Sequence, residues 1–170
     1  DARLGEPGVA LRDDAQRIHD AAERCGRIVR TFLNMARQRP AQRGAVPLND
    51  LARAAVDLLN YSLRSGGIEV GWALDPTLPL VDADADRVGQ VVLNLLVNAQ
   101  QALVAHDAAN GGPRRIRIDS WHDDAQVHLR VCDNGPGVSP DLQPRIFDAF
   151  FTTKAEGAGT GLGLSVARGV

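Results

Sequence analysis

The sequence reads QVVLNLLVNA at Gln90–Ala99, DNGPG at Asp133–Gly137, FDAFFTTK at Phe147–Lys154 and GTGLG at Gly159–Gly163. Each segment alone occurs in many unrelated proteins. Their order is more informative, because it brings helix-borne amides, a carboxylate at a strand end and a glycine-rich loop into one chain. Together the four segments predict a nucleotide site with a lid.

The first segment lies in a predicted helix over Asp86–Leu103. Its apolar residues recur at helical spacing and form one broad stripe: Val88, Val91, Val92, Leu95, Leu96, Ala99 and Leu103. Asn94 and Asn98 lie one turn apart on the opposite stripe. Asparagine disfavours a helix interior by roughly 0.5 kcal/mol. Either the two amides help to bind a hard cation such as Mg²⁺ together with substrate phosphates, or they belong to a solvated polar face.

The second segment follows a predicted strand. Residues 126–131 alternate between polar and apolar side chains, as in a half-buried strand. Gly135 and Gly137 permit positive φ and a close approach of the backbone to a flat ligand. Asp133 can accept a hydrogen bond from the exocyclic amine of adenine. The alternative is an ordinary strand-to-turn transition, since Asp-Asn-Gly is also good turn chemistry.

The glycine-rich segment ends in an apolar helical run, Leu162–Ala167. A helix N-terminus preceded by glycines offers free N–H groups to phosphates. A Walker-type loop is excluded because no Gly-Lys-Ser/Thr follows, and a dinucleotide fingerprint because the polar residues 152–156 precede the loop where a strand is required. Residues 149–160 have little apolar content after Phe151, which predicts a lid that orders with nucleotide.

In order and spacing, residues 46–170 resemble the catalytic ATP-binding domain of sensor histidine kinases. Gln90–Ala99 resembles the N box, Asp133–Gly137 the first glycine box, Ile146–Lys154 the F box and Gly159–Leu164 the second glycine box. The sequence FFTTK is similar to that of the nitrogen-regulatory type of sensor kinase. The wider superfamily includes gyrase-type, heat-shock-chaperone and mismatch-repair ATPases. The resemblance implies an α/β (α+β) two-layer sandwich of the Bergerat type, with helices on one face of a mixed sheet.

The resemblance also implies ATP and Mg²⁺ as cofactors. Asn98 would ligate the Mg²⁺ that bridges the ATP phosphates, and Asn94 would face the same phosphates. Asp133 would read adenine. The implied nucleotide-binding set is Asn94, Asn98, Asp133, Gly135, Gly137, Phe147, Phe150, Lys154, Thr160, Gly161, Leu162 and Gly163.

Within that set the lid and its glycines have separate implied roles. Phe147, Phe150 and Phe151 would form the hinge and underside of the lid, and the glycines at 159, 161 and 163 would wrap the phosphates. Lys154 would contact the γ-phosphate. Gln101 stands where many relatives carry a basic residue, so that position supplies no cation.

The N-terminal segment is a separate predicted element. Apolar residues alternate at spacings of three and four, a heptad seam: Ile18, Ala21, Cys25, Ile28, Phe32 and Met35. The resemblance makes residues 1–39 a partial dimerisation and phosphotransfer helix, 40–45 a linker and 46–170 the catalytic domain, with its last strands expected beyond Val170. The alternative is a generic amphipathic helix packed on the following domain.

The phosphoacceptor histidine is expected on a helix outside this chain, so no catalytic residue is predicted within it. His19 precedes Asp20, but the proline of the family pattern does not follow. His122 and His128 flank a predicted hairpin turn and are interpreted as structural or solvated. His106 lies in a polar loop.

Four further elements are predicted. Asn49 and Asp50 are expected to cap a helix over 51–64, and residues 68–74 form a strand. Residues 115–121 pair with 126–131 as a hairpin. Ser139-Pro140-Asp141 begins a short helix to Ile146.

Composition bounds the function. The net charge is −2 and the pI about 6.1, which gives no indication of nucleic-acid binding. Cys25 and Cys132 are far apart without metal-ligand spacing, which indicates reduced thiols. No apolar run is expected to approach membrane-spanning length, and no signal peptide is recognised. A cytoplasmic location is predicted, with anchoring of a parent protein in the inner membrane left open.

These observations favour the catalytic domain of a histidine kinase. The predicted reaction moves the ATP γ-phosphate to a histidine outside this chain and then to an aspartate of a response-regulator receiver domain. A homodimer through the N-terminal helix is expected. One alternative is a nucleotide-binding regulator or scaffold, such as a pseudokinase or phosphatase. Another is a serine kinase or ATPase of the same superfamily, against which the bundle-type helix argues.

Overall fold

The computed structural model describes residues 14, 42–105, 112–154 and 161–168. The chain divides into two units, one formed by Asp1–Arg39 and Thr153–Thr160, the other by Pro40–Thr152 and Gly161–Val170. Of the first unit only Asp14, Thr153 and Lys154 are described. The predicted heptad seam, with His19 and Cys25, therefore lies outside the described residues, as does His106.

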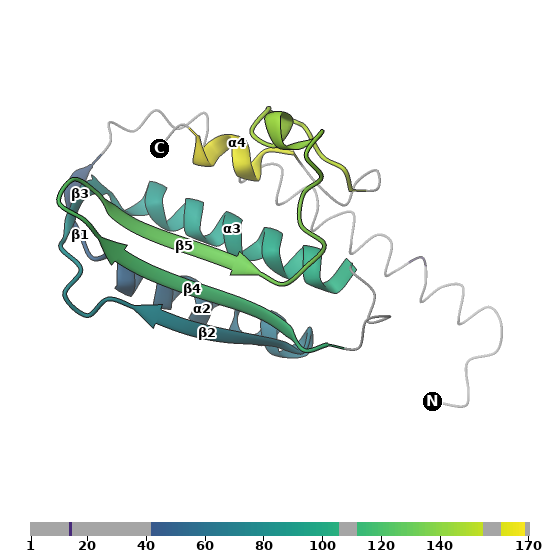
Figure 1. The fold of residues 1–170 in the computed structure, drawn as a ribbon, viewed down its shortest axis with the longest axis horizontal. Coiled ribbons are helices and arrows are strands. Elements are labelled where there is room, and N and C mark those ends of the chain that lie inside the picture. Colours follow the sequence, from purple (N-terminus) through teal and green to yellow (C-terminus); the bar gives the residue numbers. More distant parts are fainter. Residues whose placement is uncertain (1–13, 15–41, 106–111, 155–160, 169–170) are drawn as a thin grey trace. The chain divides into compact units, whose positions relative to one another are not determined.

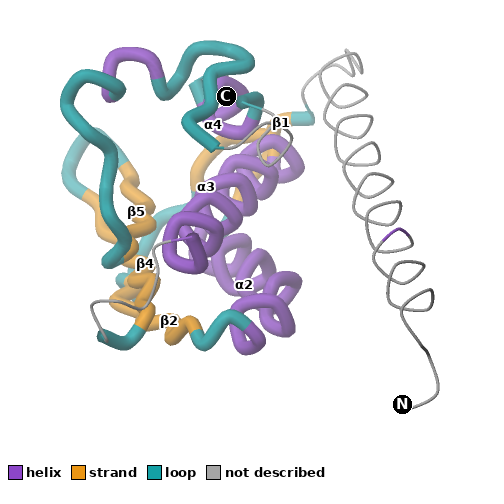
Figure 2. The backbone as a smooth tube through the Cα atoms, turned by 90° about the vertical axis from the view of Figure 1, so that its right-hand side faces the viewer, coloured by secondary structure: helices purple, strands orange, loops and turns teal. Residues whose placement is uncertain are grey.

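The second unit is built on a mixed three-stranded sheet. β2 (Ile68–Leu74) runs parallel to β4 (Arg114–His122), and β5 (Val127–Asp133) runs antiparallel to β4, in the order β2-β4-β5 (Figure 1). The predicted strand over 68–74 and the predicted hairpin are thus confirmed. Seen along the strands, the helices lie on one face of this sheet (Figure 2), so the two-layer arrangement is confirmed as well.

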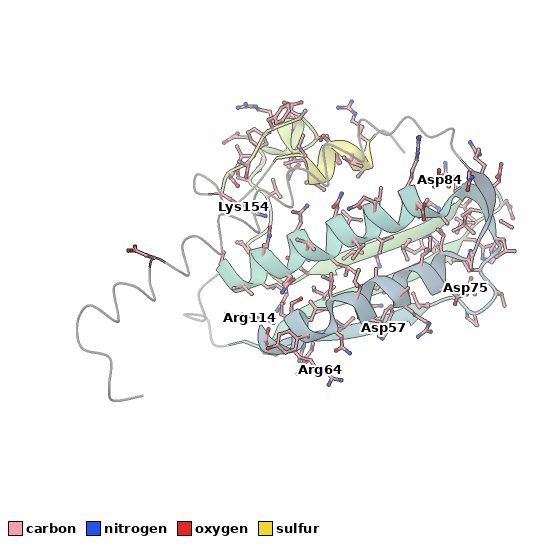
Figure 3. All side chains as sticks on the ribbon, turned by 180° about the vertical axis from the view of Figure 1, so that it is seen from behind. Asp57, Arg64, Asp75, Asp84, Arg114 and Lys154 are labelled. Atoms are coloured by element: carbon pink, nitrogen blue, oxygen red, sulfur yellow. The ribbon has the colours of Figure 1, made fainter. Side chains whose placement is uncertain are left out.

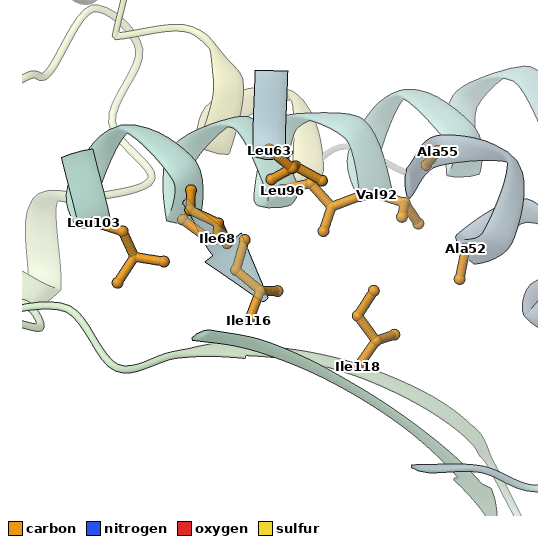
Figure 4. Close-up of a cluster of buried hydrophobic side chains, with 10 residues drawn as sticks. Ala52, Ala55, Leu63, Ile68, Val92, Leu96, Leu103, Ile116 and Ile118 are labelled. Atoms are coloured by element: carbon orange, nitrogen blue, oxygen red, sulfur yellow. The ribbon is translucent and has the colours of Figure 1, made fainter. Parts of the chain in front are cut away.

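The core lies between this sheet and two helices, α2 (Leu48–Ser65) and α3 (Ala85–Ala105). The buried members of the predicted α3 stripe are Val92, Leu96, Ala99 and Leu103. They pack with Ile116 and Ile118 of β4 and with the buried residues of α2 (Figure 4). The helical period of the sequence therefore identified the buried face of α3.

The predicted cap of α2 is wrong. The helix begins at Leu48, so that Asn49 and Asp50 lie in its first turn. Asn49 is used for tertiary contacts: its amide donates to the carbonyl of Asp75 (2.8 Å), and its oxygen accepts from the hydroxyl of Ser120 (2.8 Å). Asp75, labelled in Figure 3, follows the end of β2. The Asn49 side chain therefore joins α2 to the sheet.

A second, two-stranded sheet was not predicted. β1 (Arg43–Val46) pairs antiparallel with β3 (Val81–Asp84), with Arg43 opposite Asp84 and Val46 opposite Val81. The prediction of a linker over 40–45 is therefore wrong for residues 43–45. These polar and small residues form a strand because they pair with residues 82–84. Those partners lie far away in the sequence, so the local pattern gives no signal of the strand.

The predicted helix over 139–146 is also wrong. This segment forms turns and a 3-10 helix, η2 (Gln143–Arg145). The backbone N–H of Gln143 donates to the carbonyl oxygen of Ser139 (3.3 Å). Pro144, the next residue, has no N–H with which to continue the α-helical hydrogen bonds. The proline in the middle of the segment outweighs the good N-terminal signal.

The last described element is α4 (Gly163–Ala167), at the start of the predicted C-terminal helical run. It packs against α3. Among the described helices α3 is long and apolar enough to cross a membrane, with a mean hydropathy of 1.3. The prediction that no run approaches this length is therefore wrong. Core helices of soluble proteins pass the same test, and α3 contacts α2, α4 and the sheet.

Candidate nucleotide-binding site

A cavity of about 190 Å³ lies between α3 and the end of β5 with its following loop. It is smaller than the roughly 300–1,000 Å³ of pockets that enclose whole drug-sized ligands. The lining residues are Leu95, Asn98, Ala99, Ala102, Val131, Asp133, Gly137 and Val138. Asn98 and Asp133 are the polar side chains in this lining. The cavity suits one apolar ring system with a polar edge, and not a complete nucleotide.

Asp133 is the last residue of β5, and strand alternation decides where it points. It has the same parity as Leu129 and Val131, which pack against the core. Its carboxylate is therefore on the α3 face of the sheet. The amide of Gly135 donates to Oδ1 of Asp133 (2.9 Å). One carboxylate oxygen is thereby held in place, and the carboxylate retains capacity to accept from a ligand amine.

The two glycines after Asp133 are constrained for different reasons. Gly137 has a φ of +71°, as the sequence predicted. Gly135 does not use the positive φ that a glycine permits. A Cβ on Gly135 would instead lie 2.8 Å from Oδ1 of Asp133. A side chain at position 135 would therefore displace this carboxylate from its hydrogen bond.

The two asparagines of α3 meet the second glycine segment. Asn94 donates from Nδ2 to the carbonyl oxygen of Gly163 (3.0 Å), and its Oδ1 accepts from Nε2 of Gln90 (3.0 Å). A Cβ on Gly163 would lie 3.7 Å from Cγ of Asn94 and 3.7 Å from Nδ2 of Asn98. Both asparagines are half-buried, so this part of the polar stripe is not a solvated face.

The F-box segment and the second glycine segment are joined by backbone. The amide of Phe150 donates to the carbonyl of Gly161 (2.9 Å). Both residues have positive φ, +68° for Phe150 and +64° for Gly161. A Cβ on Gly161 would lie only 2.3 Å from the carbonyl carbon of Phe150, so any other residue would require the backbone to shift. This contact closes the base of the segment predicted as a lid.

The three phenylalanines of the F box have unequal surroundings. Phe150 is 73% exposed and Phe147 is 40% exposed. Phe151 is half-buried, with the guanidinium of Arg145 4.4 Å above its ring. Leu162, which precedes α4, is buried. The structure thus brings Gly163, the first residue of α4, to the α3 amides, while Phe147 and Phe150 remain on the surface.

Of the predicted site residues, Asn98, Asp133 and Gly137 line this cavity. Two others are not placed near it by the described contacts. Lys154 belongs to the other unit, and burial lowers the pKa of its ammonium group. Thr160 lies outside the described residues, together with the glycines at 157 and 159.

His122 and His128 have structural partners, as predicted. Nδ1 of His122 lies 2.9 Å from a carboxylate oxygen of Asp75, and Nε2 of His128 lies 3.0 Å from one of Asp123. The His128 ring also stacks on Trp121. These contacts tie the tip of the β4–β5 hairpin to its surroundings and do not involve the cavity.

The side chains near the cavity include few ligands for Mg²⁺. Within the described ranges no group of three or more His, Cys, Asp or Glu side chains could hold a metal ion. Asn98 offers one amide oxygen at the cavity. Mg²⁺ commonly takes one or two protein oxygens and completes its shell with water and substrate phosphates. The residues therefore fit a metal ion that arrives with a nucleotide.

Sequence reasoning missed three features of this site: the amide of Gly135 on Asp133, the pairing of Phe150 with Gly161, and Gln90. Only Gln90 had a detectable signal, because it lies one helical turn before Asn94 on the same stripe. The other two are backbone contacts that no side-chain pattern reports.

The fold and the site define a nucleotide-binding α/β domain in which a long helix carries amides and a strand end carries a carboxylate. Residues 83–170 match the family described as histidine kinase-, DNA gyrase B- and HSP90-like ATPases. The chain belongs to this family.

Three curated relatives cover most of this chain. It is 37% identical over 96% of its length to the two-component sensor PprA of Pseudomonas aeruginosa, and 35% identical over 92% to the sensor histidine kinase ZraS of Escherichia coli. It is 35% identical over 86% to the sensory histidine kinase/phosphatase NtrB of Rhizobium meliloti. These alignments span 18%, 32% and 41% of the relatives, so the chain corresponds to less than half of each.

Solved structures of histidine kinases share the fold. The catalytic domain of ThkA superposes with a TM-score of 0.63 at 34% identity, covering 75% of this chain and 78% of that one. Full-length ShkA in complex with AMPPNP gives 0.69 at 28% identity, over 98% of this chain and 34% of that one. ThkA in complex with the response regulator TrrA gives 0.68 at 28%, over 89% and 43%. The chain has the fold of a histidine kinase catalytic domain.

Proposed function

We propose that this chain binds Mg²⁺·ATP and acts as the catalytic domain of a sensor histidine kinase. The observation that carries the proposal is the cavity between α3 and β5, whose polar lining consists of Asp133 and Asn98. A carboxylate can accept from the adenine amine, and the apolar walls suit the ring. If the base fills this cavity and the rest of the nucleotide extends toward Gly163, its phosphates would meet the α3 amides and the start of α4.

The proposed roles follow this direction, from the base in the cavity to the phosphates near α4. Asp133, held by Gly135 and flanked by Gly137, forms the base end. Asn98 is the protein ligand of Mg²⁺, which when bound offsets phosphate charge. Asn94, Gly161, Leu162 and Gly163 form the phosphate end. Phe147, Phe150 and Thr160 belong to the lid and its hinge, and Lys154 contacts the γ-phosphate.

The reaction and the partners of the parent protein are part of the same proposal. The γ-phosphate passes to a histidine on a helix outside this chain and from there to an aspartate of a receiver domain. Similarity to ThkA, which was solved in complex with a response regulator, supports this partner class. Residues 1–39 would contribute a dimerisation helix, with residues 46–170 as the catalytic domain. The proposed location is the cytoplasm.

A regulator or scaffold that binds nucleotide without phosphotransfer is the second candidate. The relative NtrB is named both kinase and phosphatase, which favours keeping this possibility. The nucleotide site would look the same in both cases, because the difference lies in the reacting histidine and its orientation. Turnover must therefore be measured separately from binding.

Calorimetric titration with Mg·ADP tests the proposed site. Asp133→Asn replaces a charged acceptor by an amide, and losing a charge-assisted hydrogen bond costs about 1.5–3 kcal/mol. The affinity should fall about tenfold to a hundredfold. Asp124→Asn, the same change at an exposed turn residue, should bind like wild type. Equal affinity of all three proteins would refute the role of Asp133.

A further inference from the structure

Gln90, on α3, has no assigned role in the proposed site. Its side chain nevertheless begins a chain of hydrogen bonds that reaches the second glycine segment. Nε2 of Gln90 donates to Oδ1 of Asn94, and Nδ2 of Asn94 donates to the carbonyl oxygen of Gly163, each over 3.0 Å. Both bonds are partly buried. The second of these hydrogen bonds joins two residues, Asn94 and Gly163, that lie 69 positions apart in the sequence.

The direction of these bonds is set by the carbonyl at the far end. A backbone carbonyl can only accept, so Asn94 must present its NH₂ group to Gly163. The oxygen of Asn94 then faces Gln90, which must answer with its own NH₂ group. Each amide thus has one possible orientation: the Gly163 carbonyl selects it for Asn94, and the hydrogen bond from Gln90 holds Asn94 in it.

This arrangement decides how Asn94 acts. Both polar ends of its side chain are engaged within the protein, one with Gln90 and the other with Gly163. Asn98, one turn along, lines the cavity, and the Gly163 backbone lies beside it. The Gly163 carbonyl belongs to the first residue of α4. Holding that carbonyl sets the position of α4 relative to Asn98.

We infer that Gln90 and Asn94 are positioning residues, which hold the α4 end of the site in register with Asn98 for binding of the nucleotide phosphates. The inference rests on the proposed function for the identity of the ligand. Neither side chain need touch the nucleotide. Their contribution falls on the phosphate end of the site, whereas Asp133 and the cavity serve the base end.

The test separates these two ends. Gln90→Met removes the donor while keeping an unbranched side chain of good helix propensity. The affinity for Mg·ADP should fall about twofold to tenfold, the range expected for one neutral hydrogen bond. The affinity for adenosine, which has no phosphate, should not change. Gln100→Met makes the same change on the same helix, at a residue with no side-chain hydrogen bond to the described part of the chain, and should bind both ligands like wild type.

Two further variants test the order of the chain of bonds. A glutamate carboxylate offers only acceptors, so Gln90→Glu should turn the Asn94 amide round and lower Mg·ADP affinity more than Gln90→Met does. In an Asn94→Ala background, Gln90→Met should have no additional effect, because the two residues act in series. Additive losses, or an equal loss of adenosine and Mg·ADP affinity, would overturn the inference.

A measurement without nucleotide keeps the inference distinct from the proposed function. The side-chain NH₂ signals of Asn94 in the NMR spectrum report its hydrogen bond to Gly163. Gln90→Met should shift them and speed their exchange with solvent, and Gln100→Met should not. If wild type fails to bind Mg·ADP, the proposed function is wrong. The spectra still decide whether Gln90 holds the hydrogen bond from Asn94 to Gly163. Unchanged Asn94 signals in Gln90→Met would refute the positioning role of Gln90.

Discussion

At the scale of single residues, this site depends on amides and glycines more than on charged groups. Asp133 is the carboxylate of the cavity, and its orientation relies on the backbone of Gly135. Asn98 supplies a neutral oxygen. In the proposed role, a neutral ligand would leave most of the charge of Mg²⁺ to be balanced by phosphates, which fits a metal that enters and leaves with its nucleotide.

Replacement of Asn98 tests this assignment. Asn98→Ala should weaken binding of ADP in the presence of Mg²⁺ and leave metal-free binding almost unchanged, since only the metal contact is lost. The melting temperature of the free protein should stay near wild type or rise slightly, because alanine is the better helix former. Calorimetry with Mg²⁺ and with EDTA makes the comparison. The control is Asn60→Ala on the exposed face of α2; equal losses with and without metal would contradict the role of Asn98.

At the scale of elements, two connections place the site: the loop after β5 and the joint between Phe150 and Gly161. The joint brings together two residues with positive φ, one of which is a bulky exposed phenylalanine. Such backbone conformations cost on the order of 1–3 kcal/mol for non-glycine residues. They persist because α4 and the F-box segment are both held by other contacts.

Gly161→Ala tests the joint. The added Cβ would meet the Phe150 backbone at 2.3–2.6 Å at a residue with φ of +64°, so something must shift. We expect a loss of roughly 1–3 kcal/mol in the free energy of unfolding, measured by denaturant titration. Gly44→Ala in β1, where no atom lies within 4 Å of the new Cβ, should change stability little. A neutral Gly161→Ala would mean that the joint is not held in this conformation.

The β4–β5 hairpin has a predictable acid response. The backbone N–H of Ala125, together with His128 and the N–H of Gln126, lowers the pKa of Asp123 from 3.8 to about 2. Because the folded-state pKa is depressed, the ionised carboxylate stabilises the fold above about pH 4. That contribution is lost as the pH falls toward about 2.

Melting temperatures across this window check the prediction. Asp123→Asn keeps an acceptor for the turn amides but has no charge to lose. Wild type should therefore lose melting temperature faster than the variant between about pH 4 and pH 2. Asp75 and Asp119 also have lowered pKa values, through hydrogen bonds from Thr77 and Arg130 respectively, and they are the same in both proteins. Parallel curves would show that Asp123 is not coupled to folding.

At the scale of the whole molecule, the chain carries a nucleotide site without a histidine of the expected pattern. His122 and His128 are paired with carboxylates away from the cavity. His19 lacks the following proline of the family pattern. Phosphoryl transfer requires a nucleophile in line with the γ-phosphate, and such positioning accounts for much of the rate.

We therefore expect this chain alone to form no phosphohistidine, even when it binds ATP. Incubation with γ-labelled ATP should leave it free of acid-labile phosphate. Addition of a polypeptide that carries a His-acid-x-x-x-Pro helix of a close relative should produce label on that polypeptide. Label on this chain that disappears in His19→Gln would show that the acceptor is His19. Absence of label in both arrangements would favour the scaffold function.

The sequence by itself determined the elements whose signals are local. The period of apolar residues predicted α3 and its buried face, alternation predicted the β4–β5 hairpin, and motif order led to the correct family and fold. Asp133 and Asn98 were selected from the same motifs, and they line one cavity. The periodicities depend on residues close together in the sequence, and the motifs are short segments in a fixed order, so both signals survive in the linear sequence.

Only the tertiary structure decided the features that join distant segments. Arg43–Val46 is a strand because it pairs with Val81–Asp84. Asn49 does not cap α2 as predicted, and its side chain is hydrogen-bonded to Asp75 and Ser120. The hydrogen bond from Asn94 to Gly163 likewise spans most of the domain. Polar groups take the partner that satisfies them when they are buried, and where that partner lies is set by packing of the core.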